Sequence, residues 1–301
     1  MLDVCLLGTG GMMPLPNRFL TSLLLRHNGK MLLIDCGEGT QVTMKSQGWG
    51  FKSLELICIT HFHADHVAGL PGLLLAIANS GREEPLTIIG PRGLKRVVSS
   101  LLIIAGEIPF DINFVESDGG ETFDFEGYTV KTVLGEHRIN VLSYRVDIRR
   151  KGKFDVEKAE ANNIPMHIWS KLQKEGEAVL NGIKYTASMV LGSERKGISV
   201  TYCTDTRPKY EIVDLARKSD LFICEGMYGD DDKLLKAMEY KHMLFSEAAN
   251  MAALAEVSEL WLTHFSPSIP NPSEYLKFAS DIFENTIIGT DRMTKTLVFE
   301  D

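Results

Sequence analysis

The most informative residues of this chain lie around position 60, where the sequence reads Thr60-His61-Phe62-His63-Ala64-Asp65-His66. The apolar stretch from Leu54 to Thr60 predicts a strand that ends at this cluster. Side chains alternate along an extended segment, so His61 and His63 point the same way, and a turn into a helix presents Asp65 and His66. Two such pairs of ligands can hold two adjacent ions. Zinc accepts both residue types, and an open position for water makes such a site catalytic.

A chance cluster of surface histidines is the alternative interpretation of this segment. Three of the eight histidines of the chain fall within this short stretch, beside an aspartate and directly after an apolar strand. This concentration in one sequence context favours a metal site over chance.

Apolar segments on both sides of the cluster predict a mixture of strands and helices. Strands are expected over residues 2–7, 22–26, 31–35, 54–60, 87–90, 198–203, 221–225 and 260–263, with antiparallel strands between residues 122 and 149. Helices are expected over residues 68–79, 93–105 and 246–254. Asn28-Gly29 predicts a tight hairpin turn. Several strands end in a histidine or an aspartate, and polar residues at strand ends along one edge of a sheet are typical of an α/β active site.

Residues 149–197 differ from the rest of the chain. They are rich in Lys, Glu and Asn and have weak periodicity, so we expect an inserted, arm-like segment within a single domain over residues 1–301. Short helices are possible over residues 156–161 and 165–174. The segment begins with a basic cluster made of Arg149, Arg150, Lys151 and Lys153. Such a run is more often a solvated face than a phosphate contact, and we favour the solvated face here.

The composition is that of an ordinary globular protein. The 301 residues are 44% hydrophobic and 24% charged, and no run approaches the roughly 20 apolar residues that span a bilayer. The first residues lack the features of a signal peptide and are typical of an opening strand. Five scattered cysteines predict buried free thiols in a cytoplasmic protein. A net charge of −8 gives no global attraction to nucleic acid, although a local basic patch could still bind RNA.

The His-x-His-x-Asp-His pattern after a strand resembles the signature of the metallo-β-lactamase superfamily, and further motifs resemble the ribonuclease Z family, whose members trim the 3′ end of precursor tRNA. These motifs are Leu7-Gly8-Thr9-Gly10, Asp35-Cys36-Gly37-Glu38-Gly39-Thr40-Gln41, His137-Arg138 with Ser143-Tyr144-Arg145, Tyr202-Cys203-Thr204-Asp205-Thr206-Arg207-Pro208 and Leu262-Thr263-His264-Phe265-Ser266. They follow the order of the family over nearly the whole chain. The resemblance implies an α/β protein with the metallo-β-lactamase fold, an αββα four-layer sandwich of two mixed sheets flanked by helices.

The resemblance also implies two divalent metal ions per chain. One ion would be bound by His61, His63 and His137, and the other by Asp65, His66 and His264, with Asp205 bridging both. For Asp205 the competing interpretation is an aspartate that caps a turn. Zinc suits these ligands best, and manganese or iron(II) would also fit.

Three further residues are candidates for moving protons. The resemblance implies that Asp65 accepts a proton from the attacking water in addition to binding metal. Glu225 and His242 resemble the Glu–His pair with which the family protonates the departing 3′ oxygen, because a carboxylate makes an imidazole a better cation. The alternative is a surface histidine and a glutamate at a strand end.

Candidate substrate contacts are Arg18, Arg207 and Ser266, which lie in or beside the family-like motifs. The family loop Pro-x-Lys-x-Arg-Asn here reads Pro14-Leu15-Pro16-Asn17-Arg18-Phe19, and the inserted segment has Ile164-Pro165-Met166 where a Gly-Pro motif is usual. Cys224 and Met227 stand where members of the family carry polar residues. These differences concern the holding of substrate more than the cleavage chemistry.

We therefore expect a metal-dependent phosphodiesterase that resembles ribonuclease Z and cleaves precursor tRNA endonucleolytically at the 3′ side, using a water activated by metal. RNA would be the partner, and the resemblance implies a cytoplasmic homodimer without membrane association. The alternative is a hydrolase of another phosphodiester or of a small ester, thioester or lactone on the same fold. The pair Glu225 and His242 discriminates the two, since a thiolate leaves without an acid. A metal-stabilised binding protein is a third possibility, which the complete ligand set disfavours.

Overall fold

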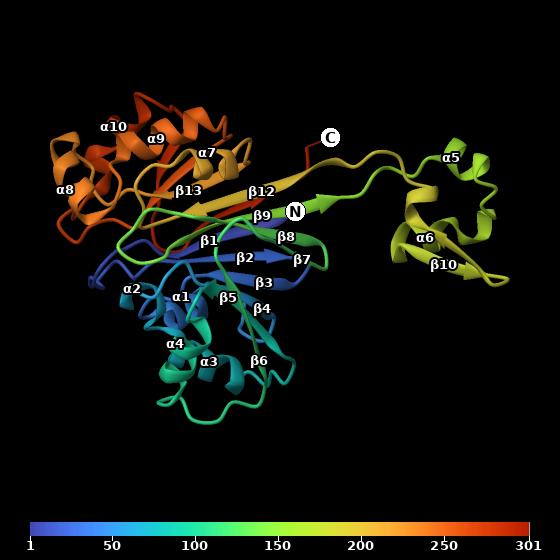
Figure 1. Ribbon diagram of the computed structural model, residues 1–301, viewed down its shortest axis with the longest axis horizontal. Coiled ribbons are helices and arrows are strands. Elements are labelled where there is room, and N and C mark those ends of the chain that lie inside the picture. Colours follow the sequence, from blue (N-terminus) through green and yellow to red (C-terminus); the bar gives the residue numbers. More distant parts are fainter. Residues whose placement is uncertain (301) are drawn as a thin grey trace. The chain divides into compact units, whose positions relative to one another are not determined.

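The computed structural model describes residues 1–300, which form two compact units. The first unit contains Met1–Asp147 and Ser199–Val298. The second contains Ile148–Ile198 and, of the described residues near the end of the chain, Phe299 and Glu300. Both units are visible in Figure 1, and each is described by itself below.

The first unit contains a seven-stranded sheet built around the segment that precedes the histidine cluster. Its strand order is β16-β1-β2-β3-β4-β5-β6, antiparallel from β16 to β3 and parallel from β3 to β6. The strands are β1 (Leu2–Gly8), β2 (Ser22–His27), β3 (Lys30–Ile34), β4 (Leu54–Cys58), β5 (Leu86–Pro91), β6 (Ile112–Ser117) and β16 (Met293–Leu297). Asn28 and Gly29 both have positive φ, 49° and 80°, as a two-residue hairpin turn of type I′ requires.

A second seven-stranded sheet completes the layers of strands. Its order is β15-β14-β13-β12-β9-β8-β7, with parallel pairing from β12 to β15 and an antiparallel hairpin of β7 and β8. The strands are β7 (Thr122–Phe125), β8 (Tyr128–Leu134), β9 (Leu142–Arg150), β12 (Arg195–Cys203), β13 (Leu221–Glu225), β14 (Leu260–Thr263) and β15 (Thr286–Ile288). The two sheets meet through hydrogen bonds such as that from the Tyr144 hydroxyl to the carbonyl oxygen of Ile59, at 2.6 Å.

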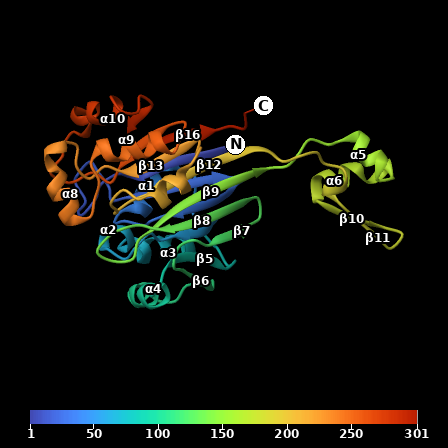
Figure 2. The ribbon, with the colours of Figure 1, turned by 45° about the horizontal axis from the view of Figure 1, so that its top comes forward.

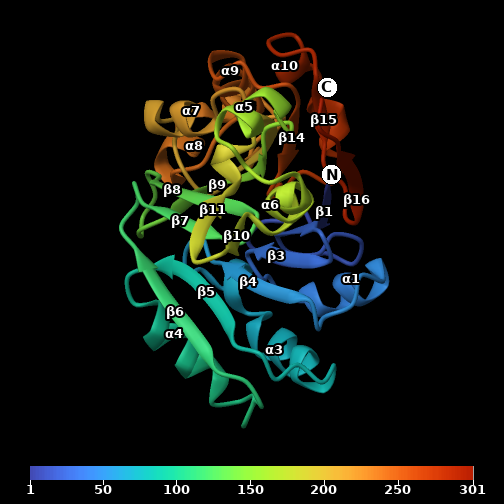
Figure 3. The same cartoon turned by 90° about the vertical axis from the view of Figure 1, so that its right-hand side faces the viewer.

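Helices cover the outer face of each sheet, as Figures 1 and 3 show. The first sheet carries α1 (Thr40–Gln47), α3 (Leu70–Asn79) and α4 (Leu94–Leu102), whose buried side chains join one apolar core with β3, β4 and β5. The second sheet carries α7 (Tyr210–Ala216), α9 (Phe245–Leu254) and α10 (Lys277–Ser280) around a second core. The expected αββα sandwich of the metallo-β-lactamase fold is therefore confirmed.

Most of the predicted elements are present with shifted ends. The helix predicted over residues 68–79 begins instead at Leu70, as α3, and the short helix α2 (Ala64–Val67) precedes it. Gly69 lies between the two helices, where a Cβ would be 2.2 Å from the carbonyl oxygen of Gly37. All five cysteines are buried and free, as predicted. No helix among residues 1–300 combines the length and apolar character needed to cross a membrane.

The second unit has a small core of its own. It contains α5 (Val156–Ala161), α6 (Trp169–Glu175) and the hairpin of β10 (Glu177–Leu180) and β11 (Ile183–Thr186), which Figure 2 shows together. Two single-turn 3₁₀ helices, η1 (Met166–Ile168) and η2 (Ala187–Met189), complete it. Its buried core residues are Ala159, Ile164, Ile168, Leu172, Ala178, Val190 and Leu191.

Candidate metal centre

Strand ends from both sheets of the first unit meet at one place. The segment after β4 supplies the four polar residues of the histidine cluster, two of them on α2. The second sheet supplies His137 between β8 and β9, Asp205 after β12 and His264 after β14. His66 and His264 are 198 positions apart in the sequence, yet their Nε2 atoms lie 3.2 Å apart. All seven residues predicted as metal ligands are thus brought together.

The first group of candidate ligands contains His61, His63 and His137. Nε2 of His61 lies 2.9 Å from Nδ1 of His63, and Nε2 of His137 lies 3.4 Å from that same Nδ1 atom. Together with a carboxylate oxygen of Asp205, the ligand atoms of this group all lie within 4.8 Å of one another. Several imidazole nitrogens that converge beside a carboxylate fit a shared cation.

The second group contains Asp65, His66 and His264, all of them buried. Oδ2 of Asp65 lies 3.6 Å from Nε2 of His66 and 3.4 Å from Nε2 of His264. Its three ligand atoms also lie within 4.8 Å of one another. A carboxylate and two imidazoles form a second donor set of the kind that binds zinc, manganese or iron.

Asp205 lies between the two groups. Its Oδ1 is 3.8 Å from Nε2 of both His61 and His137, and its Oδ2 is 3.1 Å from Nε2 of both His66 and His264. Each carboxylate oxygen therefore faces one group. This division of the two oxygens is the geometry that a bridging ligand requires.

Three residues at this centre have left-handed backbone conformations. Asp35, Asp205 and His264 have φ values of 61°, 51° and 57°. Such values are uncommon outside glycine and cost roughly 1–3 kcal/mol each, so they persist where the surrounding structure enforces them. Each of the three follows the end of a strand, where the bend turns the side chain toward the centre.

The electrostatics of the cluster suit a divalent cation. Burial lowers the pKa of His61, which favours the neutral imidazole that binds metal. Burial would raise the pKa of Asp205, but His264, His66 and His61 hold it well below its usual range, so the carboxylate is ionised. Burial would lower the pKa of His66, yet Asp205 and Asp35 raise it. The negative field responsible would also favour a divalent cation at the Nε2 atom of His66.

Asp35 supports the second ligand group from behind. Its carboxylate accepts hydrogen bonds from the backbone N–H of Thr60 at 2.8 Å and from the Thr60 hydroxyl, and it lies 2.8 Å from Nδ1 of His66. This contact holds the proton of the neutral His66 ring on Nδ1, so that the unprotonated Nε2 faces the cluster. In the sequence Asp35 stands only within a family-like motif, and no role was predicted for it. The available signal was an aspartate directly after the apolar strand β3; the structure shows that it is fully buried.

Glu225 and His242 form a buried pair beside the metal-ligand cluster. Nδ1 of His242 lies 3.0 Å from Oε2 of Glu225, whose other oxygen accepts the backbone N–H of Thr206 at 2.7 Å. Burial would lower the pKa of His242, but Glu225 and Asp205 raise it to about 9. This shift favours the cationic form of His242, which can donate a proton.

A cavity of about 340 Å³ opens over the cluster. It is lined by Met12, His63, Asp65, His137, Arg138, Asp205, Met227, Tyr228, Lys236, Tyr240, His242, His264 and Ser266. The loop after β1 closes one side, where the backbone N–H of Met12 donates to Oδ2 of Asp65 at 2.6 Å. A Cβ on Gly11 would lie 2.7 Å from the His264 ring, so glycine is required for this approach.

Only one of the three predicted substrate contacts lines the cavity. Ser266 lines the cavity, whereas Arg18 and Arg207 do not. The Arg18 guanidinium donates to the carbonyl oxygens of Ile269 and Pro270 at 2.9 and 3.0 Å. The Arg207 guanidinium forms an ion pair with Glu247 and donates to the carbonyl of His242. Both arginines therefore hold loops that surround the site.

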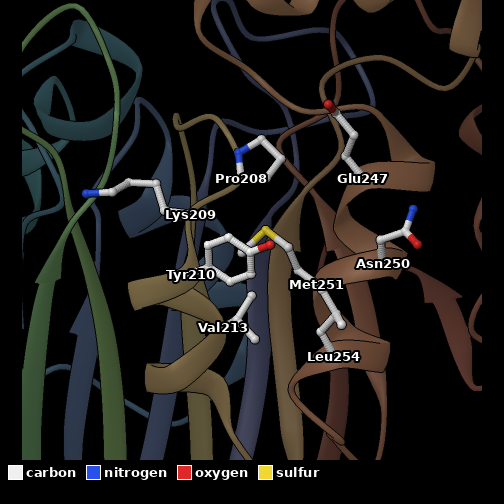
Figure 4. Close-up of a pocket in the computed structure, with 8 residues that line it drawn as sticks. All are labelled: Pro208, Lys209, Tyr210, Val213, Glu247, Asn250, Met251 and Leu254. Carbon is white, nitrogen blue, oxygen red and sulfur yellow. The ribbon is translucent and has the colours of Figure 1, made fainter.

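A further hollow of about 260 Å³ lies between α7 and α9 and is mostly apolar (Figure 4). It is lined by Pro208, Lys209, Tyr210, Val213, Glu247, Asn250, Met251 and Leu254. None of the residues that we predicted as catalytic, ligating or substrate-binding is in this lining. The hollow therefore adds nothing to the candidate metal centre.

Comparisons of the sequence identify a matching family model and close relatives. A family model described as Anti-Pycsar protein Apyc1 matches residues 2–280. Ribonuclease Z from Clostridium acetobutylicum is 54% identical over 308 residues, and the alignment covers 100% of both chains.

Two solved structures are also similar to this chain. Human tRNase Z, short form, matches with a TM-score of 0.71 and 25% identity, over 99% of this chain and 100% of the human one. The metallo-β-lactamase fold protein YhfI from Bacillus subtilis matches with a TM-score of 0.70 and 17% identity, over 98% of this chain and 100% of that one. At that identity the second likeness concerns the fold alone.

Proposed function

The chain belongs to the ribonuclease Z family, and from this premise we propose that it is a metal-dependent endoribonuclease that cleaves precursor tRNA at the 3′ side. One observation carries the proposal. Asp205 directs one carboxylate oxygen to each of two histidine-rich groups, next to the buried pair of Glu225 and His242. Two ligand groups and a separate proton donor are what hydrolysis of a phosphodiester with a poor leaving group needs.

The donor set suits two divalent ions per chain, with zinc as the proposed metal and manganese or iron(II) as possible substitutes. Bound ions of this kind would supply Lewis acidity, lower the pKa of a water and neutralise phosphodiester oxygens. His61, His63 and His137 would hold one ion. Asp65, His66 and His264 would hold the other, and Asp205 would bind both.

The residues of the chain itself then handle the protons. Asp65 would accept a proton from the attacking water, and the Met12 N–H fixes the orientation of its carboxylate. His242 donates a proton to the departing 3′ oxygen, while Glu225 holds the ring and stabilises its cationic form. The cavity between them receives the phosphodiester.

Metal affinity should depend on Asp35, although Asp35 is not among the proposed ligands. The Asp35 charge orients His66 and makes its Nε2 a better ligand. Asp35→Asn removes this charge, so we expect the affinity for zinc to fall about 10- to 100-fold. Competition with a chromophoric chelator measures this affinity directly. Asp3→Asn is a matched control, because Asp3 pairs with Arg26 on β2, away from the centre. Equal affinities in the two variants would remove Asp35 from the metal site.

We also propose that residues 149–197 are an insertion in a single metallo-β-lactamase domain and that they help to hold RNA. The corresponding unit has its own core, so its removal need not expose the core of the first unit. Replacing residues 149–197 with a short Gly-Ser linker should lower the kcat/KM for precursor tRNA about tenfold or more, through lost substrate contacts. The kcat/KM for bis(p-nitrophenyl) phosphate should fall much less. Equal losses on both substrates would make the segment structural.

We propose further that the protein is a cytoplasmic homodimer. Five buried free cysteines support a reducing compartment, and family membership supports the dimer. Sedimentation equilibrium at several protein concentrations measures the oligomeric state. A single species with the 33.5 kDa mass of one chain would contradict the dimer.

The proposed function is tested by incubating the zinc-loaded protein with a precursor tRNA and with bis(p-nitrophenyl) phosphate, and by mapping any cut in the RNA. We expect one cut at the 3′ side of the acceptor stem, abolished by a chelator and restored by added metal. Hydrolysis of bis(p-nitrophenyl) phosphate or of a small ester, with the RNA left intact, would favour the alternative of a small-substrate hydrolase.

A further inference from the structure

The lining of the cavity over the metal-ligand cluster contains two cationic side chains other than histidine, Arg138 and Lys236. Both are exposed, and within the part of the chain that the structure describes neither forms an ion pair with a carboxylate. The Arg138 guanidinium donates only to the carbonyl oxygen of Glu239, at 3.3 Å. Two cations beside the proposed cleavage site therefore keep their charge available for an anion.

Each of these cations lies against a tyrosine ring of the same cavity. The Arg138 guanidinium carbon is 5.0 Å from the ring centroid of Tyr240, and the Lys236 Nζ is 5.3 Å from that of Tyr228. The helix α8 (Leu234–Tyr240) carries both Lys236 and Tyr240. Cation–π contacts restrict long, mobile side chains, so less freedom is lost when these side chains bind an anion.

The other cations near the cavity already have strong partners within the protein. Arg207 is paired with Glu247, and Lys241 is paired with Glu136. Arg18 gives two of its donors to backbone carbonyls at 2.9 and 3.0 Å. The predicted basic substrate contacts Arg18 and Arg207 are thus turned to partners within the protein, whereas Arg138 and Lys236 line the cavity without a carboxylate partner among the described residues.

We propose that Arg138 and Lys236 bind the backbone phosphates of RNA that neighbour the scissile phosphodiester, and that Tyr240 and Tyr228 hold these two cations in position. The inference rests on the proposed function, because it requires a polyanionic substrate in this cavity. RNA carries a phosphate at every nucleotide, and arginine and lysine are its usual partners. A small ester has no such neighbouring phosphates, so these residues would favour RNA over small substrates.

The test compares Arg138→Gln and Lys236→Gln with the matched controls Arg96→Gln and Lys233→Gln. Arg96 is exposed on α4 (Leu94–Leu102), and Lys233 lies one turn before Lys236 but outside the cavity lining. Each cavity variant should lower the kcat/KM for precursor tRNA about tenfold more than that for bis(p-nitrophenyl) phosphate, which offers a single phosphate. In the control variants the ratio of the two kcat/KM values should equal that of the parent protein. Metal content is measured for every variant, because Arg138 follows a proposed ligand.

A second readout separates phosphate contact from a structural effect. Binding of a short single-stranded RNA is followed by fluorescence anisotropy at several salt concentrations. Loss of one phosphate contact should reduce the slope of log Kd against log salt by about 0.7 for each variant. Tyr240→Leu should weaken binding in the same direction as Arg138→Gln, while Tyr240→Phe, which retains the ring, should bind like the parent protein.

The two proposals fail in different ways. If the parent protein cleaves precursor tRNA but the cavity variants match their controls in both cleavage and salt slope, the phosphate contacts are wrong and the proposed function stands. If the parent protein does not cleave precursor tRNA, yet both cavity variants lose RNA affinity with the lowered slope, the proposed function is wrong and the contacts stand. A loss of bound metal in Arg138→Gln with an unchanged salt slope would also overturn the inference for that residue.

Discussion

Replacing His63 with alanine should abolish hydrolysis of both precursor tRNA and bis(p-nitrophenyl) phosphate while leaving a folded protein. Nδ1 of His63 lies within 3.4 Å of nitrogens of both His61 and His137, so its loss opens one of the two ligand groups. Lewis-acid stabilisation is worth several kcal/mol, and each 1.36 kcal/mol is tenfold in rate, so we expect a loss on the order of 10³-fold or more.

Three measurements accompany this variant. Circular dichroism and thermal unfolding establish that it folds, and mass spectrometry of bound metals counts the ions per chain. His27→Ala is the matched control, since His27 lies in the β2–β3 hairpin, where its Nδ1 contacts the carbonyl oxygen of Met1. Parent-like turnover in His63→Ala would remove this histidine from the mechanism.

Replacing His242 with alanine should have an effect that depends on the leaving group. General acid catalysis typically contributes about 10²- to 10⁴-fold, and we expect a loss of this size for RNA, whose departing 3′ oxygen needs a proton. A nitrophenolate is stable without protonation, so hydrolysis of bis(p-nitrophenyl) phosphate should fall far less. The measurement is kcat for both substrates at saturating concentrations.

Glu225→Gln tests the other member of the Glu225–His242 pair. It keeps the shape of the side chain but removes the charge that raises the pKa of His242. We expect the same selectivity for poor leaving groups, with a smaller loss than in His242→Ala. Equal losses on RNA and on the nitrophenyl substrate in both variants would argue against a proton donor and for a structural role.

The resemblance to the ribonuclease Z family predicted the fold, and local patterns indicated where candidate ligands lie. Apolar strands that end in a histidine or an aspartate are visible without coordinates, as at Thr60–His61, Cys203–Asp205 and Thr263–His264. Motif order then allowed residues from distant segments to be assigned to one centre. The structure places all seven of these side chains together.

Other features depend on tertiary contacts that no local pattern reveals. The helix α1 was not predicted, because the sequence Thr40–Gln47 has only two strongly apolar residues and begins with a left-handed Gly39. The role of Asp35 depends on His66, which is 31 residues away. The ion pair that engages Arg207 depends on Glu247, 40 residues away. Arginines in a family-like motif are therefore easily taken for substrate contacts when their partners are unknown.

Anomalous diffraction from zinc-soaked crystals tests the central claim most directly. We expect two peaks in the anomalous difference map, one beside His61, His63 and His137 and the other beside Asp65, His66 and His264. The carboxylate of Asp205 should lie between them. A well-ordered map without a peak at these residues, or with zinc bound only elsewhere on the chain, would contradict the account.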